Sequence, residues 1–106
     1  MAFRIKRNDT SPNIEYYLKD SDGNKKDITG ASVKFYMKEP NDDIVIDADA
    51  IIVDASEGRV KYSWSVSDTD KAGSYYAEWE VTFDSGKIET WPNEGFIVVK
   101  IDEDIE

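Results

Sequence analysis

The chain has 106 residues, enough for one domain, and carries 23 acidic against 13 basic side chains, for a net charge of −10. It contains no cysteine and no histidine, which excludes disulfides, thiolate metal sites and the commonest general base. The negative charge disfavours binding to nucleic acid. No apolar run approaches the roughly 18 residues of a membrane span, and no signal-peptide pattern follows Met1, so we predict a complete chain made in the cytoplasm, without a membrane partner.

The first part of the chain reads as short strands separated by turns. Residues 3–6 and 14–19 alternate apolar and polar side chains, which is the period of a strand with one buried face. Residues 20–24 contain the Asp-Gly dipeptide that favours a hairpin turn. A brief return strand is therefore predicted at residues 26–28.

The middle of the chain continues this pattern. Residues 32–38 alternate cleanly, two short β-branched runs follow at 44–46 and 51–53, and residues 60–64 alternate again. No segment has the 3.6-residue period of an amphipathic helix, although residues 67–72 have room for one helical turn. Turn signals recur about every 8–12 residues, which is the spacing of a β-sandwich.

The most regular hairpin is predicted between residues 75–83 and 88–91. A two-residue Ser-Gly loop pairs Ile88 with Phe83 and keeps both on the apolar face. A three-residue loop would turn two charged residues toward the core, so the pattern argues against it. The favoured register places Trp91 on the outer face of the sheet.

The segment 72–77 resembles the tyrosine corner of immunoglobulin-like domains, in which a tyrosine hydroxyl bonds to the backbone a few residues upstream. Tyr75 is the candidate, and Trp64 or Trp79 is the candidate core tryptophan. The alternative is an ordinary aromatic side chain within a strand. Either role is structural.

These elements together predict an all-β protein. The expected architecture is an immunoglobulin-like antiparallel β-sandwich of about seven to eight strands, in a single domain that covers residues 1–106. Residues 102–106 are acidic and follow the last apolar strand, so we expect a frayed tail there.

No group of side chains in this pattern forms a catalytic or metal site. Glu78 and Glu80 project from one strand face, about 6.5–7 Å apart, but an open sheet face offers no apolar pocket to raise a carboxyl pKa for glycosidase chemistry. The aspartates within 20–27 and 42–49 lack the order of glycine and glutamate in a calcium loop. We therefore predict no enzyme activity, no cofactor and no metal.

The best candidates for a binding surface are apolar side chains that the strand pattern leaves outside. Solvent-side aromatic rings bury much area on a partner at low entropic cost, and their alternative role is cross-strand pairing that stiffens the sheet. The final run 96–101 is apolar on both faces, which indicates cover by a tail, another strand or a second subunit. The candidate partner or ligand surface comprises Tyr17, Tyr36, Tyr76, Trp91, Ile97, Val99 and Ile101.

The order of strand and turn signatures resembles that of small bacteriophage and prophage proteins. These are similar to the amino-terminal domain of the siphophage baseplate upper protein. The resemblance spans nearly the whole chain, and its motifs are signatures of strands and turns rather than of chemistry. The segments that carry it are IKRNDT (5–10), TGASVKFYM (29–37), GRVKYSW (58–64), DTDKAGSY (68–75), AEWEVTF (77–83) and WPNEGF (91–96).

The resemblance implies a virion component that is assembled in the bacterial cytoplasm and docks into a tail, baseplate or fibre through other phage structural proteins. Because the sequence ends with this domain, we expect a free-standing accessory subunit, with self-association as a further expectation. The alternative hypothesis is a carbohydrate-binding module that stacks sugar rings on Tyr36, Tyr76 and Trp91.

Overall fold

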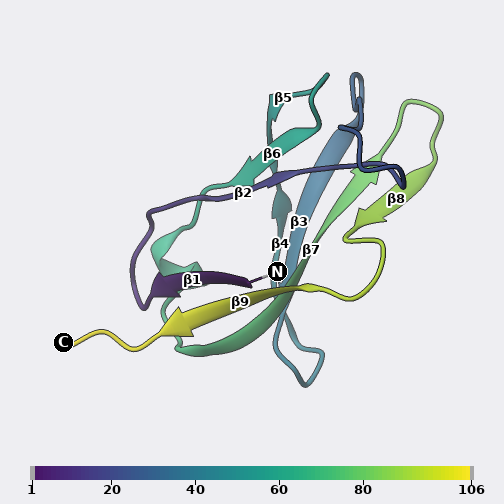
Figure 1. The fold of residues 1–106 in the computed structure, drawn as a ribbon. Helices are drawn as coiled ribbons and strands as arrows, with labels where there is room; N and C mark the ends of the chain where they lie inside the picture. Colours follow the sequence, from purple (N-terminus) through teal and green to yellow (C-terminus); the bar gives the residue numbers. More distant parts are fainter. Residues whose placement is uncertain (1, 106) are drawn as a thin grey trace.

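Two β-sheets pack face to face in the computed structural model, which describes residues 2–105 (Figure 1). The larger sheet has the order β1-β9-β7-β3-β4, with β8 also pairing to β7, and the smaller has the order β2-β6-β5. The all-β sandwich confirms the predicted fold class, with nine strands in the described residues. The strands are β1 (Ala2–Lys6), β2 (Ile14–Tyr17), β3 (Ser32–Lys38), β4 (Ile44–Asp49), β5 (Ile51–Asp54), β6 (Arg59–Tyr62), β7 (Gly73–Thr82), β8 (Ile88–Trp91) and β9 (Ile97–Asp102).

A single aromatic-rich core joins the two sheets, because alternate side chains of each strand point inward. Phe35 of β3 lies at its centre. Its ring stacks on Tyr62 of β6 at a centroid distance of 4.7 Å and lies 4.7 Å from the ring of Trp79 on β7. Both Trp64 and Trp79 are buried, so both candidate core tryptophans lie in the core.

The predicted tyrosine corner is present. The Tyr75 hydroxyl donates a hydrogen bond of 2.7 Å to the carbonyl oxygen of Lys71, four residues upstream. The connection before it includes a short 3-10 helix, η1 (Val66–Asp68), slightly earlier than the helical turn predicted at residues 67–72. Within the described chain, no helix has the length and apolar character needed to span a membrane.

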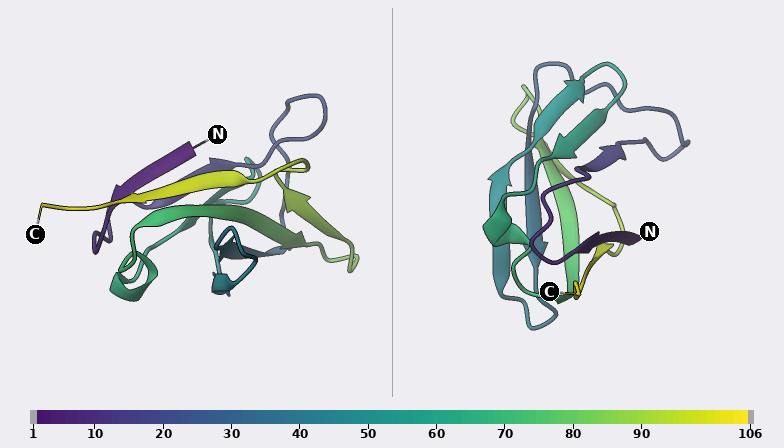
Figure 2. Two further views of the ribbon diagram at one scale, coloured as in Figure 1. Left: turned by 90° about the horizontal axis from the view of Figure 1, so that it is seen from below. Right: turned by 90° about the vertical axis from the view of Figure 1, so that its left-hand side faces the viewer.

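The last strand is covered by the chain itself. β9 lies between β7 and β1, and its pairing with β1 is parallel, where an antiparallel sandwich was predicted. Figure 2 shows the two terminal strands side by side. Ile97, Val99 and Ile101 point into the core and are fully buried. This corrects the prediction of a partner surface on these three residues, because β1 supplies the missing neighbour and the core takes their side chains.

Acidic residues at the end of the chain pair with basic residues near its start. Asp102 is the last residue of β9, and its carboxylate lies 3.1 Å from the guanidinium of Arg4. Beyond the strand, the carboxylate of Asp104 lies 3.2 Å from Arg7. The tail predicted at residues 102–106 therefore starts after Asp102, and it is ion-paired in its first part; its last residue lies outside the described residues.

The register of the β7–β8 hairpin differs from the prediction. Trp91 pairs with Trp79, and Ile88 pairs with Thr82. The amide of Phe83 donates a 2.9 Å hydrogen bond to the carbonyl oxygen of Lys87, so the loop between these two has three residues, 84–86. The last loop residue, Gly86, has a φ of +86°, the left-handed conformation that this loop type requires. The prediction was wrong because burying the indole of Trp91 removes more apolar area from water than burying Ile88, which stays 62 % exposed.

Residues 26–28 form no strand, contrary to the prediction. The preceding turn closes with a single bridge between Lys19 and Lys25, after which the chain leaves the sheet. The amide of Ile28 instead donates a 2.9 Å hydrogen bond to the carbonyl oxygen of Ala55. This contact lets the Ile28 side chain enter the core, where it is buried.

Candidate functional site

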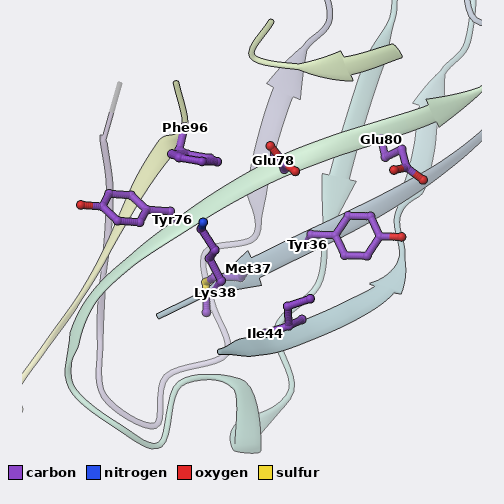
Figure 3. A pocket seen from close by; sticks show the side chains of 8 residues that line it. All are labelled: Tyr36, Met37, Lys38, Ile44, Tyr76, Glu78, Glu80 and Phe96. Carbon is purple, nitrogen blue, oxygen red and sulfur yellow. The ribbon is translucent and has the colours of Figure 1, made fainter. Parts of the chain in front are cut away.

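A groove lies on the outer face of the larger sheet, across β3, β4 and β7 (Figure 3). Its volume is about 250 Å³. The lining combines aromatic rings, carboxylates and one lysine, a mixture suited to binding. The lining residues are Tyr36, Met37, Lys38, Ile44, Tyr76, Glu78, Glu80 and Phe96.

The strand register gathers these side chains on one face. Tyr36 of β3 is paired with Glu78 of β7, and Lys38 of β3 is paired with Tyr76 of β7. All four are outward residues of strands whose alternate positions fill the core. Period-two alternation thus builds both the core and the groove from the same two strands.

A bulge in the pairing of β3 with β4 brings an isoleucine to the groove. Met37 is paired with Ile46, whereas Lys38, the next residue of β3, is paired with Ile44. The extra residue in β4 breaks the alternation, so that Ile46 is buried and Ile44 faces outward with 65 % of its surface exposed. Local periodicity gives no warning of this, since the two isoleucines are two positions apart.

Aromatic rings lie at both ends of the groove. The rings of Tyr76 and Phe96 lie together at one end, with a centroid distance of 5.3 Å, and Tyr36 lies at the other end (Figure 3). The ammonium of Lys38 sits 4.7 Å from the centroid of Phe96, and that of Lys34 sits 6.0 Å from the centroid of Tyr36. These rings therefore already face cations of the chain itself.

Lys34 and Lys38 of β3 are neutralised by aspartates of β4 and the loop before it. The ammonium of Lys34 lies 3.0 Å from a carboxylate oxygen of Asp47. The ammonium of Lys38 lies 2.6 Å from a carboxylate oxygen of Asp42. Neither lysine is therefore committed to the glutamates of β7.

The carboxylates of Glu78 and Glu80 have no ion pair among residues 2–105, although Lys34 is directly opposite Glu80 in the register. Both glutamate side chains are half-buried in the groove wall. Partial burial, and then the negative charge of Glu80, raise the pKa of the Tyr36 hydroxyl. The groove is thus negatively charged where Tyr36 meets β7.

The structure brings together two of the aromatic residues predicted for a binding surface, Tyr36 and Tyr76. Tyr17 is also outward and 44 % exposed, but it lies on the smaller sheet. There it is flanked by Lys25, 5.3 Å from its ring centroid, and by Arg59, 5.9 Å away. Tyr17 therefore belongs to a different surface from the groove.

Trp91 is not a surface residue. Its side chain is only 3 % exposed, and its indole Nε1 donates a 2.8 Å hydrogen bond to the carbonyl oxygen of Lys19. The shifted hairpin register turns it inward, which corrects its predicted place on the binding surface. The carbohydrate-binding alternative therefore loses one of the three aromatic residues on which it depended.

Sequence reasoning missed two apolar members of the groove, Phe96 and Ile44. The signal for Phe96 was its position directly before Ile97, since neighbouring residues of an extended chain point to opposite faces. Phe96 is 43 % exposed, while Ile97 is buried. No comparable signal marks Ile44, because the bulge depends on pairing with a distant strand.

The arrangement fits the binding of a ligand better than the making or breaking of a bond. Rings supply contact area, and carboxylates supply attraction for positive charge. The aspartates weighed as calcium ligands serve local turns: one carboxylate oxygen of Asp20 accepts the amides of Asp22 and Asn24, each at 2.9 Å. In the described part of the chain, no three acidic side chains gather closely enough to hold a metal ion.

Comparison with known proteins identifies the sequence family, and solved structures share the fold. The family model described as the BppU N-terminal domain matches residues 4–102. The crystal structure of CopC from Methylosinus trichosporium OB3b is similar, with a TM-score of 0.57 and 12 % identity over 98 % of this chain and 86 % of that chain. At this identity the likeness concerns the fold alone. Among curated proteins, none matches the sequence.

Proposed function

We propose that this chain works by docking onto other proteins of the virion. The premise is that it belongs to the BppU N-terminal domain family of phage baseplate structural proteins. In this proposal the protein is non-enzymatic and takes its place in the particle through protein–protein contacts. Assembly takes place in the bacterial cytoplasm, a compartment compatible with a chain that has no cysteine.

The family match carries this proposal, because it spans the sandwich from β1 to β9. The groove supports it further. A hollow of about 250 Å³ lined by rings and carboxylates offers a contact surface, whereas the described chain presents no base or nucleophile arrangement beside it. Aromatic side chains are enriched at the energetic centres of protein interfaces.

The experiment is to identify the protein in purified phage particles by mass spectrometry and to locate it by chemical cross-linking. We expect it to co-purify with tail or baseplate proteins at a fixed ratio and to cross-link to them through the face that bears the groove. A capsid protein serves as the positive control and an abundant host enzyme as the negative control. Recovery of the protein only from the soluble lysate, never from particles, would overturn the proposal.

A further inference from the structure

The groove face carries more negative charge than the chain neutralises. Glu78 and Glu80 are two residues apart on β7, so their backbone positions are separated by about 7 Å along the strand. The lysines nearest to them are held by Asp47 and Asp42, at 3.0 and 2.6 Å. Two half-buried carboxylates therefore stay without a counter-ion in the described chain.

The rings beside these carboxylates are arranged to accept a cation. Tyr36 is paired with Glu78 in the register, so a positive group on the face of the Tyr36 ring also meets a carboxylate. The opposite end of the groove is occupied, since Lys38 lies 4.7 Å from the ring centroid of Phe96. The end that Tyr36 and Glu80 line in Figure 3 is less occupied, because the ammonium of Lys34 lies farther away, 6.0 Å from the ring centroid of Tyr36, and is held by Asp47.

We propose that this end of the groove binds an arginine or lysine side chain of a partner protein, which stacks on Tyr36 and pairs with Glu78 and Glu80. The inference rests on the proposed docking function and specifies the chemistry of the partner. An arginine suits the site best, because a planar guanidinium stacks on an aromatic ring and bonds a carboxylate at the same time. The ring pair Tyr76–Phe96 offers apolar contact area to the residues on either side of the inserted cation.

Charge also decides between a heterologous partner and a second copy of this chain. With a net charge of −10, two copies repel each other, and this repulsion is strongest between acidic faces. A segment of a different protein that carries exposed basic residues is attracted instead. The groove is therefore assigned to a basic segment of another protein rather than to self-association.

The first test is a titration of the isotope-labelled chain with a short peptide of alternating glycine and arginine, followed by nuclear magnetic resonance. We expect the backbone amide signals of Tyr36, Glu78 and Glu80 to shift most. A peptide with glutamate in place of arginine is the control and should leave them unmoved. Shifts scattered over the whole acidic surface, with no maximum at the groove, would overturn the proposal.

The second test compares two double variants that remove the same charge. Glu78→Gln with Glu80→Gln should weaken binding of the arginine peptide about tenfold, the change expected when charge-assisted contacts are lost. Glu15→Gln with Glu57→Gln removes two ion-paired carboxylates, one on β2 of the other sheet and one in the turn between β5 and β6. This control should change the affinity far less. Equal weakening by both variants would show that net charge alone attracts the peptide, and it would overturn the proposal that the groove binds a basic side chain.

A ring variant and a sugar ligand complete the design. Tyr36→Ser should also weaken peptide binding, while thermal unfolding checks that the variant is folded. If oligomers of N-acetylglucosamine shift the groove amides and the arginine peptide does not, the groove is a glycan site and the proposal fails. Failure of the cation site can be told apart from failure of the docking function. The protein can be present in phage particles without binding the arginine peptide, and it can bind the peptide without being present in particles.

Discussion

The outer faces of the two sheets carry the same kinds of side chain, tyrosine, glutamate and basic residues, but they differ in how their charges are satisfied. On the smaller sheet, the guanidinium of Arg59 lies 2.8 Å from the carboxylate of Glu15. This hydrogen bond, followed by the charge of Tyr17, raises the pKa of Arg59. The outward ring of Tyr17 there is close to two cations of the chain, Lys25 and Arg59.

On the larger sheet, the groove leaves Glu78 and Glu80 without a cation in the described residues. The cause is competition between the carboxylates of β4 and β7 for the ammonium of Lys34. Lys34 is opposite both Glu80 on β7 and Asp49 on β4, and its ammonium is bound by Asp47 of β4. In a chain with 23 acidic and 13 basic residues, some carboxylates must lack a partner, and the register decides where they gather.

Phe35→Ala should have the largest effect, because it destabilises the core on which the outer faces of both sheets depend. Phe35 is completely buried and joins β3 of the larger sheet to Tyr62 of the smaller one. We expect the free energy of unfolding to fall by about 3–5 kcal/mol, the range for deleting a buried phenylalanine. Urea unfolding followed by tryptophan fluorescence measures this. Ile88→Ala, at an exposed position, is the control, and a loss equal to that of the control would contradict the prediction.

The sandwich could be predicted from the sequence because the signals for it, strand alternation and turn residues, lie within short segments of the chain. Alternation marked β3 and β7 at nearly their full lengths, and the tyrosine corner was recognisable from a glycine and Tyr75 at a strand start. The sequence also predicted that Tyr36 and Tyr76 point outward. Their role in binding a partner stays a prediction.

The rest depends on contacts between distant segments, which periodicity does not encode. The alternation of the two strands favoured the register that buries Ile88, but the observed β8 register buries Trp91 instead. The gain from burying Trp91 depends on contacts with distant segments, which alternation does not show. The cover on β9 comes from β1, at the opposite end of the sequence. Ile44 reaches the groove through a bulge that only the pairing with β3 reveals.

Tyr62→Phe tests a hydrogen bond made by a residue of the smaller sheet. The Tyr62 hydroxyl donates a 2.6 Å hydrogen bond to Asp68, and loss of a bond to a charged group should lower stability by about 1.5 kcal/mol. Burial, and then Asp68, raise the pKa of Tyr62. The protonated Tyr62 hydroxyl therefore contributes fully to the free energy of unfolding below about pH 10, the ordinary pKa of tyrosine. This contribution is lost as the pH rises toward the pKa of Tyr62 in the folded state.

Urea unfolding between neutral and alkaline pH checks this sign. We expect the wild-type stability to fall above about pH 10, and to fall less steeply in Tyr62→Phe. Tyr36→Phe in the groove is the matched control, since burial and Glu80 raise the pKa of Tyr36 but no hydrogen bond contributes. An alkaline slope that is identical in the wild type and Tyr62→Phe would refute the assignment.

Tyr75→Phe and Tyr76→Phe compare the two faces of one strand. The Tyr75 hydroxyl bonds the carbonyl oxygen of Lys71, so its removal should cost about 1 kcal/mol. The Tyr76 hydroxyl makes no hydrogen bond within residues 2–105, and its removal should leave stability unchanged. Thermal unfolding of the two variants side by side is sufficient. Equal effects would show that the hydroxyl of Tyr75 does not stabilise the corner.

The smallest effects test the comparison most directly, because loss of a carboxylate should lower the melting temperature on the smaller sheet and should not lower it in the groove. Glu15→Gln removes one partner of the ion pair with Arg59 and should lower the melting temperature slightly in low salt, with the loss fading in high salt. Glu80→Gln removes a carboxylate that has no counter-ion in the described chain, next to Glu78 on an acidic protein. Its removal relieves repulsion, so the melting temperature should stay level or rise in low salt. A loss in Glu80→Gln as large as that in Glu15→Gln would mean that Lys34 pairs with Glu80 in solution, and the groove would then hold no open carboxylate at that position.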